Sequence, residues 1–136
     1  MRLPHDGTNF GIGTLVRAAM DRWIRATLHS WRGICAALRS EMAFREEIVA
    51  LVIAVPLAFV IAQESWKRFL LIAVMLLILV VELLNTALEK LADRVSRESD
   101  VEIGRVKDMG SAAVGLSLLL AGMVWALALA EFFGLL

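Results

Sequence analysis

Three apolar runs occupy most of the chain after residue 47, and short polar segments separate them. They cover residues 48–62, 69–91 and 109–130. A helix that crosses a bilayer needs about 20 predominantly apolar residues. The second and third runs meet this length, whereas the first is short and contains Pro56, which interrupts the hydrogen-bond ladder of a helix. We predict three transmembrane helices, the first of them bent.

Residues 14–40 have a different pattern, with apolar side chains at steps of three and four from Val16 to Leu38. Arg25, Arg32 and Arg39 are seven residues apart and share another face of the same helix. An apolar face with two tryptophans beside an arginine face predicts an amphipathic helix on the membrane surface. A helix that binds a soluble partner is the alternative. Residues 1–13, rich in glycine, are expected to form a flexible tail.

The composition agrees with a membrane protein. The chain has 136 residues, of which 60% are hydrophobic, and a soluble domain of this length could not bury so much apolar surface. We therefore predict an all-α membrane protein in which residues 14–136 form one domain. The formal net charge is zero, so bulk charge does not suggest nucleic acid as a partner. Cys35 is the single cysteine, which excludes an intrachain disulfide.

Basic residues predict the orientation in the membrane. Seven arginines precede the first run, and the segment from Lys90 to Lys107 contains five basic residues, counting both ends. Only Lys67 and Arg68 lie between the first two runs. Because cytoplasmic segments carry the excess of Lys and Arg, the N-terminus should be cytoplasmic in a multi-pass protein of the cytoplasmic (inner) membrane. Small residues spaced by four in the third run, such as Ser111 and Gly115, favour close helix packing in a bundle or oligomer.

Polar side chains interrupt the cytoplasmic half of the second run at Glu82, Asn85, Glu89 and Asp93. Each helical residue turns the chain by about 100° and lifts it by about 1.5 Å. Relative to Glu82, the other three therefore lie at roughly −60°, −20° and +20°. The four residues form a polar stripe along one face, running from inside the membrane to its cytoplasmic surface.

A carboxylate at the centre of a membrane helix costs roughly 2.5 to 3.5 kcal/mol, so the polar stripe needs partners or a function. Helix–helix hydrogen bonding is the simplest reading, but Asn or Ser would serve it better than Glu. Metal-assisted phosphoryl transfer fits more fully, because Mg²⁺ prefers carboxylate oxygens and usually takes only one or two from the protein. Glu41 and Glu47, at the start of the first run, lie at the same cytoplasmic level as the outer part of the polar stripe. Glu82, deeper in the membrane, could take a proton from a lipid hydroxyl. Lys107 could neutralise the charge of a phosphate group.

Four segments resemble the small prokaryotic integral-membrane diacylglycerol kinases. They are "SWRG", "SEMAFREE", "ELLNTALEKLADRV" and "GRVKDMGSAAV", within a likeness that runs from about Asp21 to Ala130. The resemblance implies a homotrimer in which each subunit has three transmembrane helices and a surface helix. It also implies transfer of the γ-phosphoryl group of MgATP to diacylglycerol, giving phosphatidic acid, with the active site shared between neighbouring subunits.

The resemblance assigns roles to individual residues. Glu82 would be the general base, Glu41 and Glu89 would hold Mg²⁺, Asn85 would orient the reacting groups and Asp93 would support the polar network. The nucleotide-binding positions would be Arg22, His29, Glu41, Glu89, Glu98, Ser99, Asp100, Lys107 and Asp108. The substrate-binding positions would be Arg22, Trp31, Phe44, Arg45, Glu47, Glu82 and Ser111.

Two positions depart from the family pattern. His29 stands where members often carry Tyr, and the loop reads "RESDVE" in place of the commoner Tyr-His version. Undecaprenol kinase, from a related branch of the family, is the nearest alternative function. A small proton-coupled transporter would also place one Glu in the membrane, but it would not need the further carboxylates. A non-catalytic scaffold leaves the polar stripe unexplained.

Overall fold

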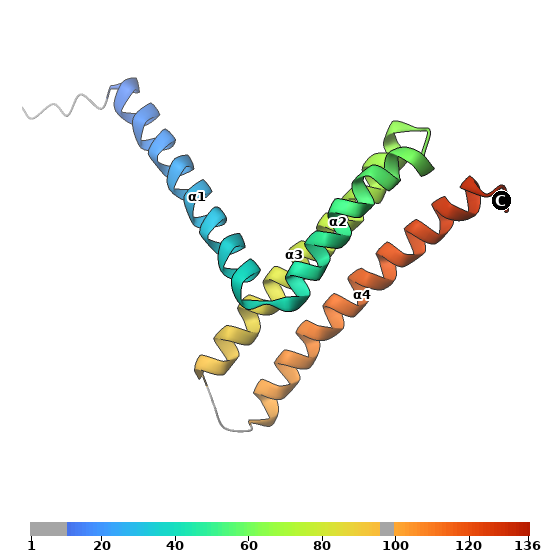
Figure 1. Ribbon diagram of the computed structural model, residues 1–136. Helices are drawn as coiled ribbons and strands as arrows, with labels where there is room; N and C mark the ends of the chain where they lie inside the picture. Colours follow the sequence, from blue (N-terminus) through green and yellow to red (C-terminus); the bar gives the residue numbers. More distant parts are fainter. Residues whose placement is uncertain (1–10, 96–99) are drawn as a thin grey trace, which may run out of the picture. The chain divides into compact units, whose positions relative to one another are not determined.

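A computed structural model describes residues 11–95 and 100–136 of the chain. Four helices follow one another: α1 (Ile12–Ser40), α2 (Met42–Ile61), α3 (Ser65–Val95) and α4 (Val101–Phe132) (Figure 1). The predicted all-α architecture is confirmed. The chain divides into two units, of which the first ends at Ala36 and the second covers Ala37–Leu136.

The first unit contains most of α1, whose described side chains are nearly all exposed. Trp23 and Trp31 have 68% and 65% of their surface exposed. The helix begins at Ile12, two residues earlier than the predicted surface helix. An exposed apolar face with tryptophans, opposite a row of arginines, is the surface that a helix at a membrane interface requires.

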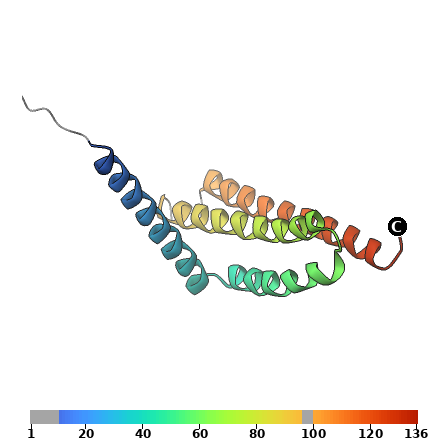
Figure 2. The same cartoon turned by 90° about the horizontal axis from the view of Figure 1, so that it is seen from above.

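In the second unit, α3 packs against α2 on one side and α4 on the other (Figure 2). Arg68 stabilises the turn between α2 and α3 with two hydrogen bonds. Its Nε donates to the Ala62 carbonyl at 2.8 Å and its Nη2 donates to the Gln63 carbonyl at 2.8 Å. A cation at the end of α2 satisfies carbonyls that the helix itself leaves unpaired. The short turn makes α2 and α3 antiparallel neighbours.

The packing between the helices relies on small side chains. Ala58 and Leu71 are 0% and 1% exposed and form one cluster with Ala62. Trp125 of α4 packs on this cluster, and its indole Nε1 donates to the Leu71 carbonyl at 3.3 Å. Alanines at these positions let α2 lie close to α3, as small residues do in membrane helix pairs.

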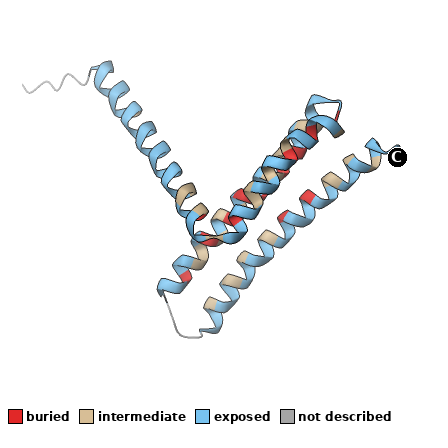
Figure 3. Ribbon diagram, viewed as in Figure 1, coloured by how far each residue is buried: buried red, intermediate tan, exposed pale blue. Residues whose placement is uncertain are grey.

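Most large apolar side chains are exposed, and most of the α4 ribbon has the pale blue colour of exposed residues (Figure 3). Phe69 and Leu116, for example, are 73% and 66% exposed. A soluble monomer rarely exposes so much contiguous apolar surface. Among the described residues, α3 and α4 are long and apolar enough to cross a membrane. The first turns of α2 carry Arg45, Glu46 and Glu47, which shorten its apolar stretch.

Both long helices extend beyond the predicted spans on the side of the polar stripe. α3 continues to Val95, and α4 already begins at Val101, where the Asp100 carboxylate accepts a hydrogen bond from the Glu102 backbone N–H at 2.8 Å. An Asp at this cap satisfies one of the unpaired donors at a helix start. The extensions put Asp93 and Lys107 on regular helices facing each other, not on a loop.

Candidate active site

The polar stripe on α3 changes from buried to exposed along its length. Glu82 is 7% exposed, Asn85 and Glu89 are half-buried, and Asp93 is exposed. Within the stripe, Asn85 Nδ2 donates to Glu89 Oε1 at 3.2 Å. The helix period places the four side chains on one face. The gradient arises because α3 is packed at Glu82 and open at Asp93.

Glu41 lies beside α3, although 49 residues separate it from Lys90 in the sequence. It caps the start of α2 with an extended backbone, and its Oε1 is 2.7 Å from Lys90 Nζ. Lys90 Nζ also donates to Ser40 Oγ at 2.7 Å. The hydrogen bond from Lys90, with a second from Ser40, holds the pKa of Glu41 below its usual value. The lowered pKa keeps this carboxylate ionised, and Lys90 is its counterion.

Glu47 is the second carboxylate on α2. Its Oε2 is buried, with no hydrogen-bond partner in the described part of the chain. Burial, and to a smaller extent the negative charge of Glu82, raises the pKa of Glu47 to about 7. On the same helix, Phe44 is 3% exposed, and Arg45 Nε donates to the Glu41 carbonyl at 3.3 Å. Phe44, Arg45 and Glu47, all predicted to bind substrate, lie in the first two turns of α2.

α4 supplies the cation of the site. Lys107 donates a hydrogen bond to Asp93, which joins α4 to the exposed end of the polar stripe. Asp108 and Ser111 are exposed on α4, and Gly110 lies directly against Asn85. A Cβ at Gly110 would meet Asn85 Oδ1 at 2.3 Å, far inside contact distance. Sequence reasoning missed both Gly110 and Lys90 as members of the site.

The remaining predicted site residues lie in other parts of the chain. Asp100 caps α4, and Glu98 and Ser99 lie outside the described residues. Arg22, His29 and Trp31 belong to the first unit. Across residues 11–95 and 100–136, no group of three or more His, Cys, Asp or Glu side chains lies close enough to hold a metal ion. The carboxylates of one chain alone do not form a complete metal cage.

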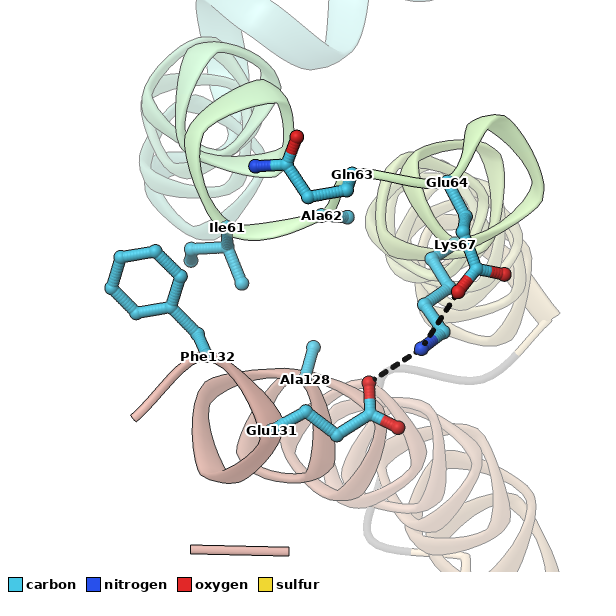
Figure 4. Close-up of a pocket in the computed structure, with 8 residues that line it drawn as sticks. All are labelled: Ile61, Ala62, Gln63, Glu64, Lys67, Ala128, Glu131 and Phe132. Atoms are coloured by element: carbon cyan, nitrogen blue, oxygen red, sulfur yellow. Dashed lines mark hydrogen bonds and ion pairs between the residues drawn. The ribbon is translucent and has the colours of Figure 1, made fainter. Parts of the chain in front are cut away.

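A polar pocket of about 310 Å³ lies at the opposite end of α3, between the α2–α3 turn and the end of α4 (Figure 4). Lys67 lines one side of the pocket, and its Nζ lies 2.7 Å from Glu131 Oε2 and 3.4 Å from Glu64 Oε1. From Glu82 it is about 22 Å along the helix axis. Because both carboxylates already neutralise its lysine, this pocket offers no free cation for phosphate. It is a structural ion-pair cluster that ties α3 to α4.

Comparison with known proteins identifies the family. The sequence profile of prokaryotic diacylglycerol kinase matches residues 28–129, which include α2, α3 and most of α4. The chain belongs to the prokaryotic diacylglycerol kinase family. Diacylglycerol kinase of Escherichia coli K12 is 42% identical over 113 residues, which cover 83% of this chain and 93% of that protein.

Two further diacylglycerol kinases show the range of the likeness. That of Pseudomonas aeruginosa is 42% identical over 110 residues, or 81% of this chain and 89% of its own length. That of Helicobacter pylori is 32% identical over 104 residues, which cover 76% of this chain and 81% of that protein. The family expected from the sequence motifs is confirmed, and with it the enzyme class, a diacylglycerol kinase of the membrane lipid kinase type.

Proposed function

We propose that this protein phosphorylates diacylglycerol to phosphatidic acid with ATP, at the cytoplasmic face of the inner membrane. The polar stripe supports this most directly, because it leads from the buried carboxylate of Glu82 to the exposed pair of Asp93 and Lys107. A lipid alcohol approaches from the buried end and a charged nucleotide from the exposed end. The relatives' name, diacylglycerol kinase, supports the choice of substrate.

Glu82 is the general base of the proposed reaction. It accepts the proton of the lipid hydroxyl as the hydroxyl oxygen forms a bond to the γ-phosphorus of ATP. The bond from that phosphorus to the β–γ bridging oxygen breaks, and ADP leaves. Phosphoryl transfer depends mainly on positioning and on charge stabilisation, and a positioned base typically contributes roughly 10²- to 10⁴-fold. Asn85, hydrogen-bonded to Glu89, orients the reacting groups.

Glu41 and Glu89 are the proposed Mg²⁺ ligands. Their carboxylate oxygens suit this hard cation, and two protein ligands are sufficient when phosphates and water complete the shell. Mg²⁺, when bound, neutralises charge on the phosphate oxygens. Lys107 binds the nucleotide phosphates. Asp108, Asp100, Glu98 and Ser99 belong to the nucleotide site. The family likeness adds Arg22 and His29 to the nucleotide site, and Arg22, Trp31, Phe44, Arg45, Glu47 and Ser111 to the substrate site.

The functional assembly is proposed to be a homotrimer with three transmembrane helices per subunit, α2 to α4, and α1 on the cytoplasmic membrane surface. Its N-terminus is cytoplasmic. The exposed apolar side chains of α3 and α4 supply surface for lipid and for neighbouring subunits. Exposed small residues on α4, including Ser111 and Gly115, allow a close approach of helices from other subunits.

The test is incubation of the purified protein with labelled ATP, Mg²⁺ and separate lipid alcohols in micelles. We expect labelled phosphatidic acid from diacylglycerol and much less product from undecaprenol. Preferential labelling of undecaprenol would assign the protein to the alternative lipid. ATP-independent proton exchange across vesicles, without labelled lipid, would reject the kinase and favour a transporter.

Glu82→Gln tests the base, because Gln keeps the size and hydrogen bonding but does not accept the proton. We expect kcat to fall by roughly 10²- to 10⁴-fold, with MgATP affinity and the oligomer unchanged. Glu131→Gln, at the opposite end of α3 and α4, is the matched control and should retain wild-type kcat. More than about a tenth of wild-type kcat in Glu82→Gln would be too much for the loss of a base and would reject this role.

A further inference from the structure

The closest approach between α3 and α4 at the polar stripe is made by Gly110 and Asn85. A Cβ built on Gly110 would lie 2.3 Å from Asn85 Oδ1, 3.4 Å from its Cγ and 3.6 Å from Leu88 Cδ2. Real Cβ atoms essentially never come within 3.0 Å of another heavy atom. The amide of Asn85 therefore occupies the space that any side chain at position 110 would fill.

The orientation of the Asn85 amide follows from its other contact. Its Nδ2 donates to Glu89 Oε1 at 3.2 Å, and a carboxylate only accepts, so the amide oxygen must point the other way. Oδ1 is buried and has no conventional hydrogen-bond partner in the described part of the chain. It faces the α-hydrogen that Gly110 carries in place of a Cβ.

This contact brings the Cα–H group of Gly110 to the Asn85 amide oxygen. A Cα–Cβ bond is about 1.5 Å long, so the Gly110 Cα lies within about 3.8 Å of Oδ1. Contacts between Cα–H and a carbonyl oxygen recur where helices pack closely, and they are individually weak. Such a contact contributes little to the free energy of unfolding. Its effect is on orientation, because Glu89 holds the Nδ2 of the Asn85 amide while Gly110 leaves room for its Oδ1.

We propose that Gly110 is a positioning residue for phosphoryl transfer: its missing side chain admits the Asn85 amide against α4, and this contact holds Asn85 on Glu89. The inference rests on the proposed function, in which Asn85 orients the reacting groups and Glu89 binds Mg²⁺. Gly110 itself touches neither substrate nor metal.

Gly110→Ala tests the proposal, because it adds only the methyl group that collides. Oδ1 is at the end of a side chain, so the amide can turn away at little cost, but it must move by about 1 Å to reach an ordinary contact of 3.4 Å. A misplacement of this size in a catalytic group can cost about 10²-fold in rate. We expect a loss of that order in kcat, a higher Mg²⁺ concentration for half-maximal activity and an intact, folded oligomer.

Gly122→Ala is the matched control on the same helix. A Cβ at Gly122 meets no atom within 4 Å in the described chain, and the replacement brings the same gain in helix propensity as Gly110→Ala. We expect wild-type kcat and Mg²⁺ dependence in this variant. An equal loss of activity in the control would mean that helix propensity or α4 packing is responsible, and would overturn the proposal.

A double-mutant cycle on thermal stability tests the contact whether or not the variants are active. In the wild-type background, the displaced amide should make Gly110→Ala raise Tm less than Gly122→Ala does. In an Asn85→Ala background no amide remains to be displaced, so the two glycine variants should raise Tm equally. A difference that persists in this background would overturn the contact. Absence of wild-type lipid phosphorylation, with the cycle as expected, would reject the proposed function but not the contact.

Discussion

Lys90 occupies the carboxylate that we assign to Mg²⁺, and its removal should strengthen metal binding. Lys90 Nζ lies 2.7 Å from Glu41 Oε1. An ammonium group and Mg²⁺ compete for the same oxygen, so Lys90 has to leave before Glu41 can bind the metal. Lys90→Met keeps an unbranched side chain of similar length and removes the charge. The metal should then bind without displacing a partner.

The size of the effect follows from the exposure of the pair. The side chains of Lys90 and Glu41 are 53% and 27% exposed. Ion pairs with this much access to water change an equilibrium constant by a factor of at most about five. We therefore expect the Mg²⁺ concentration for half-maximal activity to fall by up to about fivefold in Lys90→Met.

The assay is the rate of lipid phosphorylation against free Mg²⁺ at a fixed, saturating concentration of ATP. Lys90→Arg keeps the positive charge and should retain the wild-type Mg²⁺ requirement. In a Glu41→Gln background there is no carboxylate to compete for, so Lys90→Met should have no effect on this requirement. An unchanged or higher requirement in Lys90→Met, with Glu41 present, would refute the competition and the assignment of Glu41 to the metal.

Three further predictions test other parts of the site. Glu89→Gln removes a hard anionic ligand but keeps the shape, so activity should saturate at a higher Mg²⁺ concentration; saturation at the wild-type concentration would contradict the assignment. The pKa of Glu47, raised from 4.5 to about 7, means that the folded state binds more protons between these values, so Tm in detergent should fall as pH rises from about 5 to 8. Glu47→Gln should flatten this slope, and identical slopes would show that Glu47 does not cause it. Crosslinking in native lipid should trap a trimer, and bands no larger than a dimer would exclude it.

The helical period along a single chain was sufficient to predict the polar stripe. Glu82, Asn85, Glu89 and Asp93 fall on one face of any α-helix, whatever packs beside it. Burial then follows the predicted order, from Glu82 inside to Asp93 outside. The sequence was also sufficient to predict the all-α fold and the two long apolar helices. A long apolar run in a membrane forms a helix because its backbone groups must bond to each other. The motifs around Asn85 and Lys107 were specific enough to give the family.

The partners of the stripe could not be derived in the same way. Lys90 reaches Ser40 across 50 residues, and it counted in the sequence only as a basic residue that orients the membrane spans. The sequence also left open whether residues 93–108 form a polar loop or extend the helices, and it is the extensions that bring Lys107 to Asp93. Polar residues beyond an apolar run predict equally well a loop or a continued helix.

Which residues share a face of each helix depends on the 3.6-residue repeat within one segment, so the order of amino acids was enough to predict it. Which faces meet, and in what register, depends on the packing between helices. The contact of Gly110 with Asn85 depends on the register of α4 relative to α3 and on the distance between the two backbones. Those quantities are set by the sum of side-chain packing between helices, including the alanines that bring α2 to α3, and not by the pattern within either helix.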